Sequence, residues 1–468
     1  MQIPILSGIY VDGGPDIRTA YPVNMVAVPT ASGISNGYLR PAEGIVHLVD
    51  GPGKDRGGII WNGSHYRVMG TKLVKITSNN IISVLGDVGG DESEYVIFDY
   101  SFDRLAVTSD RKLFYWNGTT LTQVTDPDLG PVINFCWVDG YFITTDGAAL
   151  VVTELTDPTQ VNPLKYGSSE VDPDPVVALL RLRNEVYALN RHTIEAFDNV
   201  GGEFFPFQRI EGAQVQKGCV GVHACCVFIE NIAFLGSGRN EAPAIYVAAN
   251  ATATKISTQE IDDILLAYTE DQLATVKLES RVDRSHQYLY VHLPDRTLVF
   301  DAIASRVLNQ EVWSTLVSTS VDFAQYRARN FTWAYGQWYC GDPASNGLGH
   351  LTRELSHHWD QIVRWEFGTL ISFNEGNGAI FHQIELVALT GSVALGVNPT
   401  ITTSHSTDGR TWGQDWPVNV GTTGQYNKRI CWFRQGHMRQ RRIQRFRGDS
   451  QAHVSFLRLD ARIEPLNY

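Results

Sequence analysis

The chain has 468 residues, of which 43% are hydrophobic, 11% aromatic and 19% charged, and its 38 basic and 50 acidic side chains give a net charge of −12 at pH 7. Many aromatic and few charged residues exclude an intrinsically disordered chain and provide apolar surface for several cores. The 42 glycines follow no Gly-X-Y period, which excludes a collagen-like chain and indicates many turns.

Residues 1–45 form the first segment, with scattered prolines and the run Gly13-Gly14-Pro15. We expect an extended arm that lies on the domain that follows. The start Met1–Leu6 has neither a basic region nor a long apolar run, so it is not a secretory signal. No later stretch approaches the roughly 18 apolar residues that a membrane helix needs.

Residues 46–350 repeat one unit, two short strands joined by a turn. The first clear unit is Ile59–Trp61, the turn Asn62-Gly63 and Tyr66–Met69. From Asn62 to the turn at Gly336 the units recur six times, about every 46 residues, which is typical of propeller blades. A β-sandwich would not need so many similar units. The sequence therefore predicts an all-β fold, a β-propeller with six or seven irregular blades.

One helix interrupts this pattern near residues 258–268. Ser257 followed by Glu260 fits a capping box, and Ile261, Ile264, Leu265 and Tyr268 follow at helical spacing. We expect a packing or docking helix inserted between blades. After it, residues 351–468 show longer strands and predict a separate C-terminal domain like a β-sandwich.

Two motifs could carry chemistry, and both are more simply structural. The run Ser406–Trp412 resembles the Asp-box of sialidase-type propellers but is one residue short, and we interpret it as a turn. His357-His358 with Asp360 could suggest a metal site, but adjacent side chains of a strand face opposite ways. The six cysteines form no Cys-x-x-Cys pair and are expected to be buried thiols. We therefore predict no enzyme activity, no metal and no cofactor.

The most unusual charge feature is residues 428–447, which carry eight basic and no acidic side chains. Arginine binds carboxylate or phosphate with two parallel hydrogen bonds. The candidate contact residues are Arg439, Arg441, Arg442, Arg445 and Arg447. On one strand Arg439, Arg441, Arg445 and Arg447 would share a face, with Ile443 between them. This face would meet an acidic protein or DNA, a protein being favoured because the chain is acidic overall; the alternative is a solvated or intrachain-paired face.

Several stretches together resemble the tail hub proteins of short-tailed bacteriophages, also called packaged-DNA stabilisation proteins or tail accessory factors. The opening carries Tyr21-Pro22-Val23-Asn24-Met25 and Gly37-Tyr38-Leu39-Arg40-Pro41, and departs mildly from the family pattern at Ala42-Glu43. Further matching stretches are Ile256–Thr258, Leu298–Asp301, Glu311–Trp313, Ser406–Trp412 and the arginine-rich run.

This resemblance implies a structural virion protein, made in the bacterial cytoplasm and found in the tail. Its expected partners are further copies in a hexameric ring, the portal-adaptor protein, the tail needle, the tailspike and DNA in the tail channel. It would close the DNA exit channel and stabilise the packaged genome. The alternative function, suggested by the Asp-box and the aromatic residues, is a carbohydrate-binding or carbohydrate-hydrolysing propeller, which would need clustered carboxylates in a pocket with exposed tryptophan.

Overall fold

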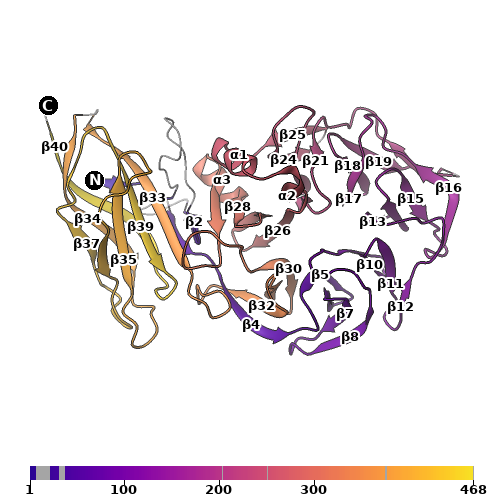
Figure 1. The fold of residues 1–468 in the computed structure, drawn as a ribbon, viewed down its shortest axis with the longest axis horizontal. Coiled ribbons are helices and arrows are strands. Elements are labelled where there is room, and N and C mark those ends of the chain that lie inside the picture. Colours follow the sequence, from indigo (N-terminus) through magenta and orange to yellow (C-terminus); the bar gives the residue numbers. More distant parts are fainter. Residues whose placement is uncertain (7–21, 31–36, 203, 250, 375–376, 467–468) are drawn as a thin grey trace.

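The computed structural model describes residues 1–6, 22–30, 37–202, 204–249, 251–374 and 377–466. In this part of the chain a ring of four- and five-stranded sheets stands beside a seven-stranded and a four-stranded sheet that face each other (Figure 1). The prediction of an all-β chain, a propeller followed by a β-sandwich, is confirmed. The run Gly13-Gly14-Pro15 lies outside the described residues. Among the described helices none has the length and apolar character that a bilayer crossing requires.

Seven sheets of the described residues form the blades of the propeller, the higher of the two expected counts. Blade one contains β5 (Asp55–Trp61), β6 (Ser64–Met69), β7 (Lys72–Ile76) and β8 (Ile82–Asp87). Blade two contains β9 (Ile97–Tyr100), β10 (Leu105–Ser109), β11 (Lys112–Trp116) and β12 (Leu121–Gln123). Blade three contains β13 (Asn134–Val138), β14 (Tyr141–Thr145), β15 (Leu150–Thr153) and β16 (Val161–Gly167).

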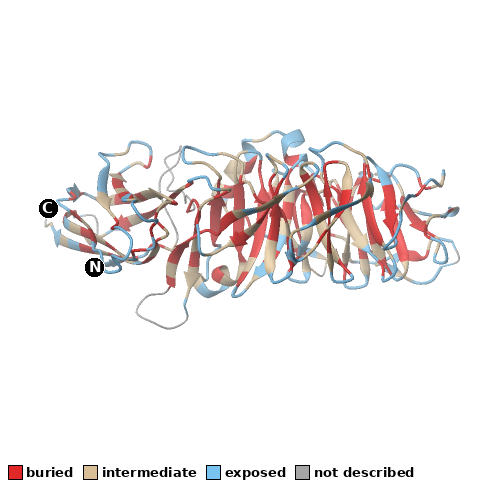
Figure 2. Cartoon of the chain, turned by 90° about the horizontal axis from the view of Figure 1, so that it is seen from below, coloured by how far each residue is buried: buried red, intermediate tan, exposed pale blue. Residues whose placement is uncertain are grey.

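Blades four to six continue around the ring in the same order. Blade four contains β17 (Val176–Leu182), β18 (Glu185–Asn190), β19 (Ile194–Asn199) and β20 (Phe207–Arg209). Blade five contains β21 (Gly218–Cys219), β22 (Cys225–Phe228), β23 (Asn231–Ser237), β24 (Ala244–Ala249) and β25 (Thr252–Lys255). Blade six contains β26 (Lys277–Asp283), β27 (His286–His292), β28 (Thr297–Asp301) and β29 (Trp313–Leu316). Buried strands alternate with exposed turns around the whole ring (Figure 2).

Blade seven is built from both ends of the propeller sequence. It contains β30 (Arg329–Ala334), β31 (Gln337–Gly341) and β32 (Gly347–Thr352), and its outer strand is β4 (Gly44–Asp50). Because β4 precedes blade one in the chain and pairs antiparallel with β32, hydrogen bonds between distant segments close the ring.

The hairpins follow from residues that tolerate a left-handed backbone. Asn62 and Gly63 have φ of 47° and 71°, and Asp139 and Gly140 have φ of 50° and 92°. These values suit two-residue hairpin turns, so the predicted turns at both sites are confirmed. The turn expected at Glu230-Asn231 begins one residue earlier, since Ile229 and Glu230 carry the positive φ angles of 49° and 56°.

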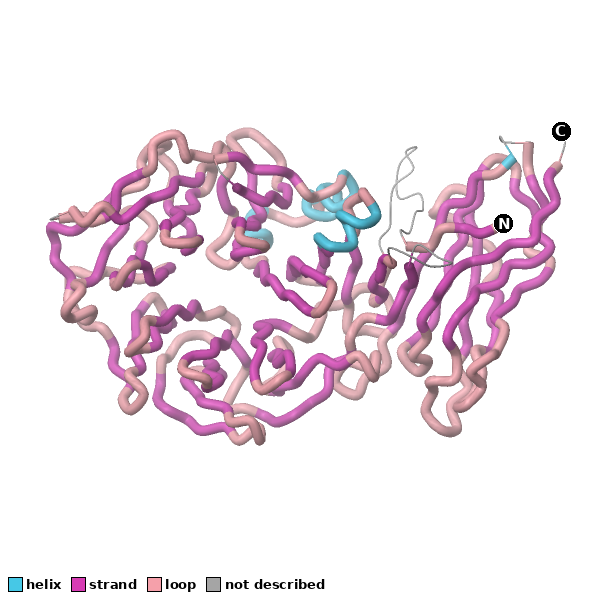
Figure 3. The backbone as a smooth tube through the Cα atoms, turned by 180° about the vertical axis from the view of Figure 1, so that it is seen from behind, coloured by secondary structure: helices cyan, strands magenta, loops and turns pink. Residues whose placement is uncertain are grey.

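The predicted helix is present, but its start differs. Helix α1 (Gln259–Leu266) has Thr258 at its N-cap position, and α2 (Glu270–Ala274) follows at once. The Ser257 hydroxyl instead donates to Asp262 at 2.6 Å, which anchors the first turn from outside. The complete capping box belongs to α2, between Thr269 and Gln272. With α3 (Ala302–Leu308), α1 lies on the side of the propeller nearer to the sandwich (Figure 3).

The sandwich consists of two sheets around one apolar core. The first contains β2 (Met25–Pro29), β3 (Gly37–Pro41), β40 (Ser455–Pro465), β34 (Ala379–Leu389) and β37 (Ile430–Phe433), with β1 (Gln2–Ile3) on β40 and β38 (His437–Met438) on β34. The second contains β33 (Arg364–Ser372), β39 (Arg441–Asp449), β35 (Thr400–Ser406) and β36 (Trp416–Asn419). The described part of residues 1–45 therefore does not merely lie on the propeller: Met25, Ala27 and Leu39 are buried in the sandwich core.

A buried ion pair of blade one is hydrogen-bonded to the last blade. Arg67 of β6 donates two 2.6 Å hydrogen bonds to Asp55 of β5, and both side chains are 0% exposed. Asn330 of β30 donates to the same carboxylate at 2.6 Å and accepts from Arg67 at its carbonyl at 2.8 Å. A Cβ at Gly341 of β31 would collide with the Asp55 carboxylate, so the close approach of the two blades requires glycine there.

Removing one partner of this pair should destabilise the propeller strongly. Arg67→Met leaves the Asp55 carboxylate buried without its cation, and we expect the free energy of unfolding to fall by about 3–5 kcal/mol. Urea titration followed by tryptophan fluorescence measures this change. Lys72→Met is the matched control, because it removes the exposed pair with Asp87 on the same blade and should cost less than about 1 kcal/mol. Equal losses in the two variants would contradict the assignment.

Candidate assembly surface at the propeller–sandwich junction

The residues Val23 and Asn24 connect the propeller to the sandwich through the backbone. Val23 forms one β-bridge with Thr315 of β29 and another with Glu366 of β33. The Asn24 side chain donates to the carbonyls of Val317 at 2.9 Å and Arg364 at 2.7 Å. Its own φ is 52°, a conformation that asparagine tolerates better than most residues. Val23 and Asn24, called the clasp below, therefore fix the position of blade six relative to the second sandwich sheet.

Glu43, at the position where the opening departs from the family pattern, makes a second contact. It lies between β3 of the sandwich and β4 of the propeller and is bonded to two arginines of the propeller. Arg281 of β26 donates to Glu43, and Arg353 donates to it at 3.2 Å. Arg281 lies among the rings of Tyr288, Tyr290, Phe331 and Trp338, at 5.3–5.7 Å from each ring centre. Burial raises the pKa of Glu43, but the charges of Arg281 and Arg40 outweigh it and lower this pKa to about 2.

The five candidate arginines do not form one surface. β39 begins at Arg441, so Arg439 lies in the exposed bend before the strand. Arg442 points into the sandwich core and is 0% exposed, with Nε donating to Gln444 at 2.8 Å and its guanidinium 4.7 Å from the Phe381 ring centre. Burial lowers the pKa of Arg442 to about 10. Arg442 therefore cannot contact a partner while the fold is intact, because strand alternation turns it inward.

The other face of β39 carries Arg441, Ile443, Arg445 and Arg447, as the alternation predicted. Arg445 lies 3.7 Å from the centre of the Trp412 ring and donates to Ser404 at 3.3 Å. Arg447 donates to both carboxylate oxygens of Asp415 at 2.6 Å. Two of the candidates are therefore held by contacts within the chain, while Arg441 is half-buried.

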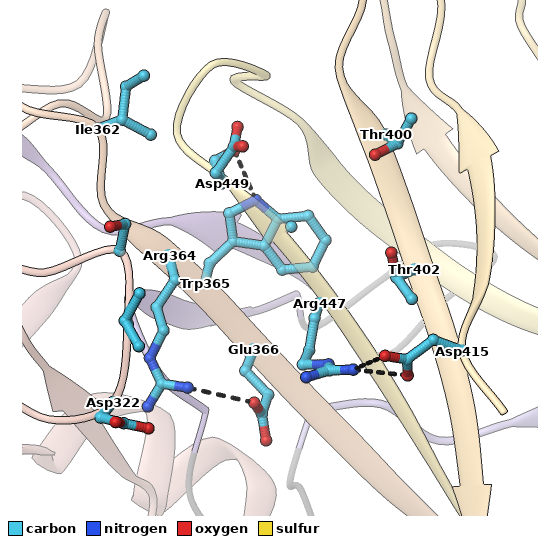
Figure 4. Close-up of a pocket in the computed structure, with 13 residues that line it drawn as sticks. Asp322, Ile362, Arg364, Trp365, Glu366, Thr400, Thr402, Asp415, Arg447 and Asp449 are labelled. Carbon is cyan, nitrogen blue, oxygen red and sulfur yellow. Dashed lines mark hydrogen bonds and ion pairs between the residues drawn. The ribbon is translucent and has the colours of Figure 1, made fainter. Parts of the chain in front are cut away.

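Between this face and the propeller lies a cavity of about 480 Å³. β33 contributes Arg364 and Glu366, β39 contributes Arg447 and Asp449, and the propeller contributes the loop Ser320–Asp322. Figure 4 shows Arg364 directed toward Glu366, their nearest charged atoms 3.6 Å apart, and Arg447 toward Asp415. The Nε of Arg364 is buried and has no hydrogen-bond partner among the described residues.

The lining of this cavity is polar and carries both signs of charge. It holds four carboxylates (Asp322, Glu366, Asp415 and Asp449), two guanidinium groups and several hydroxyls. No group of three or more metal-binding side chains was found among the described residues. Trp365 is only 3% exposed and its indole N–H is bonded to the Asp449 carbonyl at 3.0 Å, so its ring is not open for stacking on a sugar. Mixed donors and acceptors suit a polar segment of a partner protein.

The two motifs that could have carried chemistry have structural surroundings. Asp408 accepts from the Ser406 hydroxyl at 2.8 Å and from the N–H groups of Arg410 and Thr411 at 2.9 and 2.8 Å. These hydrogen bonds lower the pKa of Asp408, and they confirm the interpretation of the Asp-box-like run as a turn. His358 is buried with Nδ1 2.8 Å from the Ser318 hydroxyl, which fits the structural interpretation of that histidine pair.

Sequence reasoning missed the residues that form the junction. Arg364 and Asp415 lie outside the basic run, and nothing in their neighbours signals a shared cavity. The asparagine after Pro22-Val23 was a possible signal, because asparagine is enriched at positive φ. Tyr21 of the same motif lies outside the described residues.

Two family models match the chain. The model described as Bacteriophage P22 Gp10, beta-propeller, matches residues 1–356, and the model described as Bacteriophage P22 Gp10, beta-sandwich, matches residues 364–464. The tail hub protein gp10 of Salmonella phage P22 is 28% identical to this chain over an alignment of 465 residues. The match covers 94% of this chain and 94% of that protein.

Among solved structures, similarity is found to the Neurospora crassa Pan2 WD40 domain, with 10% identity and a TM-score of 0.42 over 66% of this chain and 94% of that chain. The N-terminal domain of Nup159 has 9% identity and a TM-score of 0.40 over 69% of this chain and 97% of that chain.

The Glu43 contact predicts an acid-dependent stability. Since the folded pKa of about 2 lies below the ordinary value of 4.5, the stabilisation is present above pH 4.5 and is lost as the pH falls toward 2. We expect Glu43→Gln to lower the free energy of unfolding by about 3 kcal/mol at pH 7, with the gap to wild type narrowing below pH 4.5. Urea titrations from pH 7 to pH 2.5 test this. A gap that stays constant across that range would contradict it.

Proposed function

The chain belongs to the bacteriophage P22 Gp10 family, and from this membership we propose that it is a structural tail protein rather than an enzyme. The observation that carries the proposal is the match of both domains, residues 1–356 and 364–464, together with 28% identity to a tail hub protein over 94% of the chain. No catalytic residue is assigned. The carbohydrate alternative loses support, since Trp365, the tryptophan at the carboxylate-lined cavity, is 3% exposed and its indole N–H is bonded to the Asp449 carbonyl.

The proposed role has finer parts. Copies of the chain assemble as a hexameric ring below the portal and its adaptor, close the DNA exit channel after packaging, and anchor the tail needle and the tailspikes. A closed ring repeats one interface at each subunit, which suits a plug that resists the pressure of packaged DNA. The clasp at Val23 and Asn24 supports this role, because a force on one domain is transmitted to the other through backbone hydrogen bonds.

The proposed location is the virion tail, after synthesis in the host cytoplasm. The net charge of −12 opposes association of free subunits and favours assembly on a preformed template ring.

We further propose that the basic run contacts an acidic tail partner through Arg439 and Arg441, with Arg447 at the edge of the junction cavity. Arg439 is exposed and Arg441 half-buried, while Arg445 and the buried Arg442 support the sheet that presents them. A protein partner is favoured over DNA in the tail channel because the acidic remainder of the chain would repel a duplex.

Deletion of the gene tests the tail function. A phage without this chain should package its DNA and then lose it, because nothing closes the exit channel. DNA content of purified particles, measured before and after storage, reports the loss, and a plasmid copy of the gene should restore retention. Deletion particles that keep their DNA and infect normally would overturn the proposal.

Charge reversal tests the basic contact. Arg439→Glu with Arg441→Glu should reduce attachment to adaptor-bearing heads by about tenfold or more, because repulsion replaces attraction at the partner's carboxylates. Attachment is measured by sedimentation at low and raised salt. Arg458→Glu is the matched control, since Arg458 lies in the other sheet and is paired with Asp460 at 2.9 Å. A folded double variant that attaches like wild type at both salt concentrations would contradict the contact.

A further inference from the structure

Exposed apolar side chains gather at the rim of the propeller farthest from the sandwich. We call this set the distal rim: Leu155, Leu164, Tyr166, Val200 and Phe204. Leu164 is 67% exposed, Val200 58% and Phe204 56%. Figure 1 places β16, which carries Leu164, at the end of the molecule opposite to the sandwich. Exposed apolar clusters of this kind on a folded protein mark interaction sites.

The distal rim is one surface over blades three and four. Beside the end of β16, the ring of Phe205 occupies the space above Gly167. On the other side Leu155 lies against the turn 139–140, and Asp139 of this turn accepts a hydrogen bond from Asn199 at 3.3 Å. Asn199 directly precedes Val200. The outer strand of blade three and the loop before β20 are thus adjoining parts of a single patch.

The backbone of the rim also offers hydrogen bonds. β16 is the last strand of its sheet and pairs with β15 on one side. In the described residues no strand pairs with its other side. Natural proteins usually cover or charge such an edge. β16 contains Pro163, which has no N–H to donate, and Lys165, which is paired with Glu154. The exposed Leu164 and Tyr166 lie on the same strand, so this edge is suited to a partner that supplies apolar contacts and pairs with the remaining backbone groups.

The segment that contains the distal rim is acidic, and this charge favours one kind of partner. Residues 121–211 contain 14 acidic and five basic side chains, a net charge of −9. This single segment therefore accounts for most of the net charge of −12. Three of these carboxylates are paired within the chain, Glu154 with Lys165, Glu195 with Arg209 and Asp172 with Arg239. Others are exposed, among them Asp139, Glu170 and Asp198. Exposed carboxylates repel nucleic acid and attract basic protein surfaces.

We propose that the distal rim is the docking surface for a different tail protein, one that presents a basic surface with apolar side chains at its centre. The proposal rests on the proposed function, because it names where this hub holds a partner. Another copy of this chain fits less well. Its sandwich is basic, with 12 basic and eight acidic side chains in residues 364–464, but much of this charge is committed within the chain. Arg429 is paired with Glu385, Arg447 with Asp415 and Arg458 with Asp460.

Loss of the apolar centre tests the docking surface. Leu164→Ser with Phe204→Ser is introduced into the full chain, and virions are purified from a phage whose own copy of the gene is deleted. Particle composition is measured by quantitative mass spectrometry. We expect the variant chain to be incorporated at the wild-type level while one other particle protein of positive net charge falls by about tenfold or more. The matched control is Ile81→Ser with Val84→Ser, which removes equally exposed apolar residues, 60% and 57%, from blade one.

A photocrosslinking phenylalanine analogue at position 164, with the same analogue at position 84 as control, identifies the occupant. Crosslinks from position 164 to a basic particle protein support the proposal. Crosslinks to another copy of this chain, or variant particles of unchanged composition, would overturn it. Absence of the wild-type chain from purified virions would instead overturn the proposed function.

Discussion

Closure of the seven-bladed ring depends on a strand that precedes the first blade in the chain. The chain runs from β4, the outer strand of blade seven, into β5 of blade one, and the antiparallel pairing of β4 with β32 closes the ring without a covalent bond. The contact between blades one and seven, called the seam, is also stabilised by the buried pair of Asp55 and Arg67. Asn330 of blade seven donates a hydrogen bond to Asp55 and accepts one from Arg67. Two charges without water are stabilising only when every donor and acceptor is used, so this seam tolerates little change.

The segment that closes the ring also binds the two domains together. Before it reaches β4, the chain supplies β1, β2 and β3 to the sandwich, and between β1 and β2 it passes Val23. Because Val23 bridges Thr315 and Glu366, a sheet of the propeller and a sheet of the sandwich continue into each other. The described strands of the first fifty residues are therefore shared by both domains, β1, β2 and β3 with the sandwich and β4 with the propeller. This arrangement limits rotation at the junction.

Charge is used in two different ways along the molecule. Near the junction, cations are held by carboxylates, as with Arg281 and Glu43 or Arg447 and Asp415. In residues 121–211, which contain the distal rim, acidic residues outnumber basic ones, and the apolar side chains of the rim are exposed. The first arrangement fixes the positions of strands. The second leaves exposed apolar side chains in an acidic segment, which suits contact with another molecule.

The sequence by itself determined the fold class, because the period-two strands, the Asn62-Gly63 and Asp139-Gly140 turns and the regular spacing are local signals that survive in the folded chain. The resemblance of the opening motif led to the family, but neither it nor the spacing could show that Asn24 and Glu43 make contacts with residues about 240 to 340 positions away. The basic run was visible as composition, and strand alternation put Arg441, Arg445 and Arg447 on one face. Only the tertiary structure decided that Arg442 is buried and that Asp415 neutralises Arg447, since burial and pairing depend on which distant strands pack against β39.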